Sequence, residues 1–277
     1  MNEADAIATS TRPASVTTLV ADLRSLGLAV GDVVIVHTAM SRLGWIAGGA
    51  QALVLALLDS VGTTCAGTTT GGGTIVMPAH SGLSDPAGWS NPPVPADWIP
   101  VIRAETPAFD AALTPTRAMG QTVDCFRSHP STVRGNHPTV SFAANGPLAR
   151  RIVDDHPLTP SLGEGSPLQR LYDLDAKVLL LGVDHGNNTS LHLAEHRAIW
   201  PGKHSYTDGA PVLVDGERRW VTYEDLVLDE EDSPAIGEAF AATGFEQAGP
   251  IGAGVGRLSS VRAVVDFAVE WIEQHRS

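Results

Sequence analysis

Three ionisable side chains in one short segment form the strongest candidate for chemistry in this 277-residue sequence. Residues His192, Glu195 and His196 stand at positions i, i+3 and i+4, so they share one face if the segment is helical. The same stretch matches H-x-x-E-H, in which two histidines bind zinc and the glutamate is a general base. The pentapeptide alone leaves three interpretations open: a zinc site, a metal-free histidine base held by a carboxylate, and a solvated polar helix face.

An apolar run directly precedes this segment and must position it. Residues 178–183 have the pattern of a buried strand, and a helix is expected from about Thr189. The polar segment therefore sits at the carboxyl end of a strand, which is the edge where α/β sheets bind ligands.

Other segments repeat this alternation of helices and wholly apolar strands. Strands are expected at 33–36 and 74–78, and helices at about 17–26 and 50–61. Such alternation is typical of a layered α/β domain. Further elements are expected as follows: helices at 117–128 and 146–154, a strand at 139–143, a hairpin over 212–221 with an Asp-Gly turn, and a closing helix capped by Ser259 or Ser260.

Domain boundaries and loops complete this outline. Residues 1–14 are small and polar and are expected to form a loose tail, followed by one domain over 15–277. Residues 79–116 form a long segment rich in Pro, Trp and Asp, which we expect to be a wall of the substrate site. Residues 62–73 are rich in glycine but lack the spacing of a phosphate-binding loop, which favours a flexible surface loop.

Charge and composition exclude several classes of function. The chain has 31 acidic and 18 basic residues and a net charge of −13, which disfavours nucleic acid and favours a cationic ligand. Its longest apolar runs are strand-sized, far short of a membrane span. No secretory signal is visible near Met1, and the two cysteines form no C-x-x-C pair, so a cytoplasmic protein is expected.

Several motifs in a fixed order resemble the aminoglycoside 3-N-acetyltransferase family. The resemblance extends over about residues 17–273. It is carried by the stretches at 33–44, 73–81, 107–110, 114–116, 133–141, 165–168, 178–183 and 189–195. Each stretch is weak alone, and their common order and spacing make the resemblance specific.

The resemblance implies a fold and an activity. The fold would be a single α/β domain with a central mixed sheet flanked by helices, distinct from the GNAT acetyltransferase fold. The reaction would transfer acetyl from acetyl-CoA to the 3-amino group of the deoxystreptamine ring of an aminoglycoside, conferring resistance, with no metal. Acetyl-CoA and the aminoglycoside would be the partners, and the oligomeric state stays open between monomer and homodimer.

Resemblance also assigns catalytic roles. His192 would be the general base, because an imidazole can remove the proton that keeps the substrate amine from attacking a thioester. The orienting acid would be Asp225 or Glu195, with Asp229 or Glu231 as alternatives under a shifted alignment.

Two acidic residues would bind the cationic substrate. They are Asp110, in the long loop, and Asp225. We expect acidic residues to gather on this side of the site, with positive charge and backbone N–H groups on the acetyl-CoA side.

Two stretches resemble the family's cofactor-binding segments. The first follows the strand at 33–36 and contains His37, Thr38, Ala39, Ser41, Leu43 and Gly44. Because Ala39 replaces a hydroxyl residue, we expect that position to act through its backbone N–H. The second contains Arg134, whose guanidinium suits a phosphate, and His137, with Gly135 where serine is usual.

Two other functions remain as alternatives. A zinc hydrolase would use His192, His196 and Glu195, with Glu270 or another downstream acid as a further ligand. A non-catalytic protein would instead sequester a cationic small molecule.

Overall fold

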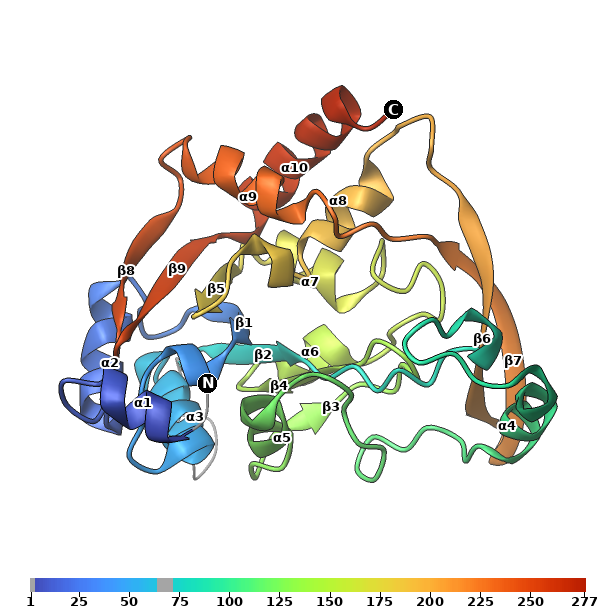
Figure 1. Ribbon diagram of the computed structural model, residues 1–277, viewed down its shortest axis with the longest axis horizontal. Helices are drawn as coiled ribbons and strands as arrows, with labels where there is room; N and C mark the ends of the chain where they lie inside the picture. Colours follow the sequence, from blue (N-terminus) through green and yellow to red (C-terminus); the bar gives the residue numbers. More distant parts are fainter. Residues whose placement is uncertain (1–2, 64–71) are drawn as a thin grey trace.

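The computed structural model, which describes residues 3–63 and 72–277, contains a seven-stranded mixed sheet (Figure 1). The strand order is β3-β4-β2-β1-β5-β9-β8. The strands are β1 (Val33–Thr38), β2 (Thr74–Pro78), β3 (Val133–Arg134), β4 (Phe142–Asn145), β5 (Lys177–Leu181), β8 (Gln247–Ile251) and β9 (Gly254–Ser260). Strand β1 pairs in parallel with β2 and β5, and the outer pairs are antiparallel. The expected α/β fold with a central mixed sheet is therefore confirmed.

Helices cover both faces of this sheet, which explains why its central strands are apolar over most of their length. In β1, Val34 and Val36 join one core cluster, whereas Ile35 joins the other. The first cluster is covered by α2 (Val16–Ser25), α3 (Gly49–Ser60) and α5 (Gln121–Arg127). The second is covered by α6 (Ala149–Val153), α7 (Pro167–Asp173), α8 (Leu191–Arg197), α9 (Ser233–Ala241) and α10 (Val261–His275).

A long hairpin stands apart from the central sheet, at the right of Figure 1. It consists of β6 (Ser205–Val214) and β7 (Glu217–Leu226), so it is longer than the expected 212–221. Asp215 and Gly216 form its tip with φ values of 53° and 81°, as a two-residue turn of this kind requires.

The expected long loop at 79–116 contains helical structure and packs against this hairpin. It includes the short helices η2 (Pro86–Gly88) and η3 (Ala96–Trp98) and the helix α4 (Ile99–Glu105). The backbone N–H of Phe109 donates to the carbonyl of Pro211 at 3.0 Å, a usual distance for a backbone hydrogen bond. The segment is therefore held against the hairpin by residues about 100 positions away, which its local sequence does not predict.

The expected loose tail also contains ordered structure. Residues Glu3–Thr9 form α1, in which Ala6 is buried. The indole N–H of Trp45 donates to the carboxylate of Glu3 at 3.1 Å. The N-terminal segment therefore packs on the loop that follows β1 and is not loose where the structure describes it.

The remaining comparison concerns the glycine-rich segment, membrane-spanning helices and elements that the sequence analysis did not predict. Residues 64–71 of the glycine-rich segment are outside the described residues. None of the helices in the described part of the chain is long and apolar enough to cross a membrane. Elements without a counterpart in the sequence-based expectations are β3, β8, β9, α7 and α9.

Candidate active site

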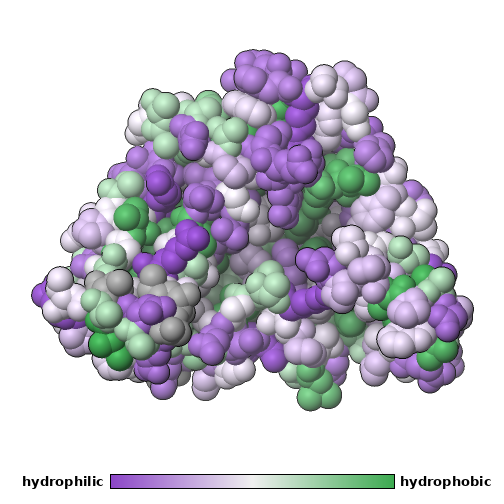
Figure 2. Space-filling model, viewed as in Figure 1, coloured by the Kyte–Doolittle hydropathy of each residue, from purple (hydrophilic) through white to green (hydrophobic). Residues whose placement is uncertain are grey.

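The carboxyl ends of β1, β2 and β5 bring three histidines to one edge of the sheet. His37 and Thr38 end β1, His80 follows β2, and His192 lies on α8 beyond β5. Because these strands are parallel, their carboxyl ends meet at the same edge. Figure 2 shows the molecule hollowed near the centre of this view, with hydrophilic residues along much of the rim.

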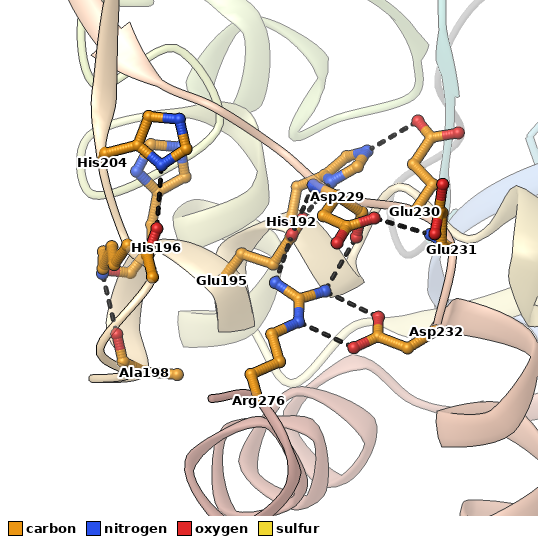
Figure 3. A network of polar contacts seen from close by, with 12 residues as sticks. His192, Glu195, His196, Ala198, His204, Asp229, Glu230, Glu231, Asp232 and Arg276 are labelled. Carbon is orange, nitrogen blue, oxygen red and sulfur yellow. Dashed lines mark hydrogen bonds and ion pairs between the residues drawn. The ribbon is translucent and has the colours of Figure 1, made fainter.

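His192 and Glu195 form a buried pair on the first turns of α8 (Figure 3). The distance from His192 Nδ1 to Glu195 Oε2 is 2.7 Å. The other carboxylate oxygen, Oε1, accepts from the backbone N–H of Asp229 and from Arg276 Nη1, each at 2.8 Å. Burial alone would raise the pKa of Glu195, but these three donors outweigh it and hold that pKa below its usual value. Glu195 is therefore an ionised carboxylate that fixes the imidazole ring.

The bond to Glu195 decides which nitrogen of His192 can accept a proton. Since a carboxylate only accepts, Nδ1 carries the hydrogen and Nε2 is directed away from Glu195. The carboxylate of Glu230 lies 3.5 Å from Nε2, and its side chain is 69% exposed. Burial lowers the pKa of His192, but the bonds and charges of Glu195 and Glu230 raise it to about 9. The ligand-free site therefore holds His192 as an imidazolium at neutral pH.

Four buried polar atoms beside His192 have no hydrogen-bond partner among the described residues. They are His37 Nε2, Thr38 Oγ1, His80 Nε2 and Ser190 Oγ. Burial, and then the charge of His192, lower the pKa of His37 and of His80 to about 3. Both rings are neutral in consequence. Unpartnered buried polar groups are costly, so a cluster of them at a sheet edge suits a polar ligand.

The carboxylate that is bonded to His192 is that of Glu195 and not that of Asp225. Asp225 Oδ1 accepts from the backbone N–H groups of Ser161 at 3.3 Å and Leu226 at 3.0 Å, and no hydrogen bond in the described structure joins it to His192. Neither of the alternatives, Asp229 and Glu231, has a side-chain hydrogen bond to His192 in the described structure. Asp229 contacts Glu195 through its backbone, and its side chain accepts from the N–H of Glu231.

The segment after β1 that is expected to bind the cofactor contributes to the wall of a pocket of about 600 Å³. Ser41 and Gly44 are part of its wall, together with Met40, Trp45, Ile46, Gly48, Gly49, Gln121 and, from α1, Glu3 and Ala6. One expectation for this segment is wrong in detail. The backbone N–H of Ala39 donates to the carbonyl of Leu181 at 2.9 Å, so it is not free for a ligand. The side chain of Leu43 is fully buried in the core.

The geometry of Arg134 is that of a structural residue. Its guanidinium donates to the carbonyls of Ala79, Ala111 and Thr114 and to the hydroxyl of Ser141, which ties the 79–116 segment to β3 and to the residue before β4. These contacts use the N–H groups that a phosphate would need, so the expected phosphate contact is not supported.

His137 and Gly135 also have structural roles. His137 Nδ1 accepts from the N–H groups of Thr139 and Val140, and Nε2 lies 3.2 Å from the carbonyl of Leu158. A Cβ at Gly135 would lie 2.6 Å from the carbonyl oxygen of Val153, so the usual serine does not fit here.

The two expected substrate acids lie in different surroundings. Asp110 is exposed, and its carboxylate accepts from the N–H groups of Ala112 and Leu113 as a turn-forming residue. Asp225 lines a pocket of about 360 Å³ together with Asp208, Tyr206 and Tyr223. Both tyrosine hydroxyls lie within 3.4 Å of the Asp208 carboxylate, which is buried. This acidic pocket belongs to the β6–β7 hairpin.

The zinc-hydrolase alternative is not supported. Among residues 3–63 and 72–277, no group of three or more His, Cys, Asp or Glu side chains is arranged to hold a metal ion. Glu195, the general base of that hypothesis, has both oxygens bound by His192, Arg276 and the backbone of Asp229.

Residues of the site without a counterpart among the predicted site residues include His80, Ser190, Asp208, Glu230 and Arg276. The position of His80 after a predicted apolar strand, like that of His37, is a signal that sequence reasoning could have used. No local pattern points to Arg276, because its contacts lie 44 to 81 residues away in the sequence.

Comparison with known proteins places this arrangement in a family. The profile of the family described as aminoglycoside 3-N-acetyltransferase matches residues 35–273. One relative is the SPbeta prophage-derived aminoglycoside N(3')-acetyltransferase-like protein YokD of Bacillus subtilis. It is 43% identical to this chain, over 96% of this chain and 94% of its own length. Its crystal structure superposes with a TM-score of 0.92, over 98% of each chain.

Two further relatives carry the same family name or a bound ligand. Aminoglycoside N(3)-acetyltransferase VIII of Streptomyces fradiae is 36% identical, over 99% of this chain and 96% of its own length. A solved structure described as AAC-IIIb binary with CoASH is 33% identical, with a TM-score of 0.82 over 96% of this chain and 98% of that one. The resemblance seen in the sequence is thus confirmed, and this chain belongs to the aminoglycoside 3-N-acetyltransferase family.

Proposed function

We propose that this enzyme transfers the acetyl group of acetyl-CoA to the 3-amino group of the deoxystreptamine ring of aminoglycosides, conferring resistance to them. The observation that carries the proposal is the buried His192–Glu195 pair, 2.7 Å between Nδ1 and Oε2, at the edge where the central parallel strands end. Family membership supports both substrates, since a relative binds CoASH. A cytoplasmic location is part of the proposal, because acetyl-CoA is a cytoplasmic metabolite.

His192 supplies the proton transfer. His192 acts as the base in its neutral form, after the imidazolium of the ligand-free site has lost its Nε2 proton. With Nδ1 still bonded to Glu195, Nε2 then takes a proton from the substrate ammonium. The freed amine then attacks the thioester carbonyl carbon, the new N–C bond forms, and the C–S bond breaks. The proton on Nε2 passes to the departing thiolate, which leaves as the thiol of CoA, and the nitrogen loses its second proton to solvent as the amide forms. The overall reaction thus releases one proton and needs no covalent enzyme intermediate.

The neutral groups beside His192 suit the other reactant. His37 Nε2, Thr38 Oγ1 and Ser190 Oγ are buried and unpartnered in the described structure, so they can donate to a carbonyl oxygen as it gains charge. The pocket lined mainly by residues between Met40 and Gly49 has the volume to take part of a CoA chain.

The acidic pocket of the β6–β7 hairpin suits the polycationic substrate. Asp225 and Asp208 are both at its wall, and Glu230 stands at the exposed side of His192. Carboxylates in a partly enclosed pocket favour ammonium groups. We therefore assign the antibiotic to this side and retain Asp225 as a substrate-binding residue.

A thiol-release assay tests the proposal. Enzyme, acetyl-CoA and a set of aminoglycosides should release free CoA, and an aminoglycoside whose 3-amino group is blocked or missing should not. Mass spectrometry of the product should show one added acetyl group on that nitrogen.

Two results would contradict it. Tight aminoglycoside binding without thiol release identifies the non-catalytic binder. Stoichiometric zinc that leaves together with activity on chelation identifies the hydrolase.

A further inference from the structure

We infer that Arg276 is a positioning residue for catalysis: it holds the Glu195 carboxylate, and through it the imidazole of His192, in the orientation that proton transfer needs. The inference rests on the proposed function, because it assumes that His192 is the base. It concerns a residue that directly follows α10, far from the sheet edge in sequence.

The guanidinium of Arg276 joins three parts of the molecule (Figure 3). Nη1 donates to Glu195 Oε1 on α8 at 2.8 Å. Nε and Nη2 donate to the two carboxylate oxygens of Asp232, at 2.7 and 2.6 Å, and Nη2 also donates to the carbonyl of Asp229 at 2.8 Å. The ring of Trp200 lies 5.1 Å from the guanidinium carbon.

Only an arginine can make this set of contacts. The two parallel bonds to Asp232 fix the plane of the guanidinium, and the remaining Nη1 is then aimed at Glu195. A lysine ammonium has the charge but no planar fork. The side chain is only 10% exposed, so solvent competes weakly for these bonds.

The same contacts tie α8, which carries His192 and Glu195, to the loop after β7. Glu195 Oε1 accepts from both Arg276 and the backbone of Asp229, and Arg276 in turn binds the Asp229 carbonyl. Glu230, next in sequence, reaches Nε2 of His192. Arg276 therefore sets the distance between the two carboxylates that contact opposite nitrogens of one imidazole.

The positive charge of Arg276 also balances Glu195. Other charged or titratable groups around the pair are Glu230, Asp232, Lys203, His37, His80 and His196. Without Arg276, the negative charge of Glu195 acts on His192 without opposition and favours the imidazolium more strongly. Loss of Arg276 should thus change the acid–base behaviour of His192 as well as its orientation.

The test compares Arg276→Met, Arg276→Lys and the control Arg262→Met. Arg262 is in the first turn of α10, the helix that Arg276 follows, and donates to the carbonyls of Tyr172 and Asp173, away from the pair. Arg276→Met should lower kcat about a hundredfold with KM changed by less than about threefold. The acidic limb of kcat/KM, and the NMR titration of His192, should move up by about one pH unit. Arg276→Lys should restore the titration and only part of kcat, and Arg262→Met should change neither.

A merely structural role gives a different result. If Arg276→Met lowers thermal stability but leaves the His192 titration and kcat at wild-type values, the inference is wrong. If that variant does not fold, Asp232→Asn serves instead, since it removes the anchor of the guanidinium without touching His192 or Glu195. It should lower kcat about tenfold, and an unchanged kcat would overturn the inference. Failure of the proposed function itself shows separately, because wild-type enzyme would then release no thiol.

Discussion

The pKa values of the buried histidines in this protein are shifted in opposite directions. His192 is bonded to one carboxylate and faces a second, and its pKa is raised to about 9. His37 and His80, at the same sheet edge, have pKa values lowered to about 3, mainly by burial. Nearby, His156 and His137 are lowered to about 3 and about 4, also mainly by burial.

The difference shows that the partner, and not the depth of burial, decides the charge of these rings. Burial penalises the imidazolium in every case. Among these five rings, only His192 has carboxylates placed to overcome that penalty. The rings of His137 and His156 instead lie with centroids 4.4 Å apart and their planes tilted by 37°, an arrangement in which a proton on one ring disfavours a proton on the other. The fold thus keeps one histidine charged among several that are neutral.

Removing the charged histidine should have the largest effect. His192→Ala is expected to lower kcat by about a thousandfold or more, because a positioned general base contributes roughly 10²–10⁴ to rate. Steady-state thiol release measures it, and binding of acetyl-CoA by calorimetry should stay close to wild type. Near-normal turnover in this variant would show that His192 is not the base.

The neutral histidines should control stability in acid. For a group whose folded pKa is depressed, the stabilisation is complete above its unfolded value of about 6.5 and is lost as the pH falls toward the folded value. His37, His80, His137 and His156 each contribute about 1.4 kcal/mol per pH unit in that window. Urea unfolding between pH 7.5 and pH 4.5 should therefore show a steep loss of stability.

A pair of variants isolates this effect. His156→Gln should reduce the slope of unfolding free energy against pH by about 1.4 kcal/mol per unit. His204→Gln, at an exposed histidine, serves as the matched control and should leave the slope unchanged. Equal slopes in both variants would contradict the assignment of His156 as a buried neutral ring.

The smallest effect should come from the exposed carboxylate. Glu230→Gln removes one of the two charges that raise the pKa of His192, so the acidic limb of kcat/KM should move down by about one pH unit. Activity at pH 7 should change by less than about tenfold. Glu231→Gln alters the neighbouring exposed carboxylate and should not move the limb; a shift there instead would place the wrong acid at Nε2.

Local sequence determined the scaffold of this site. Apolar runs at 33–36, 74–78 and 178–181 are strands because residues buried on both faces of a sheet must all be apolar. The spacing of His192 and Glu195 was enough to place them on one helix face, and they are bonded there. Both inferences depend on the side-chain repeats of strands and helices, which can be recognised within a few consecutive residues.

Only the tertiary structure decided which groups act on His192 and which are already occupied. Arg276 lies 81 residues from Glu195, and Arg134 reaches carbonyls up to 55 residues away. A guanidinium or a backbone N–H such as that of Ala39 is free for a ligand only if no other segment satisfies it first. That depends on which distant parts of the chain pack together, so the charge of His192 and the roles of Asp225, Arg134 and Arg276 are properties of the folded chain.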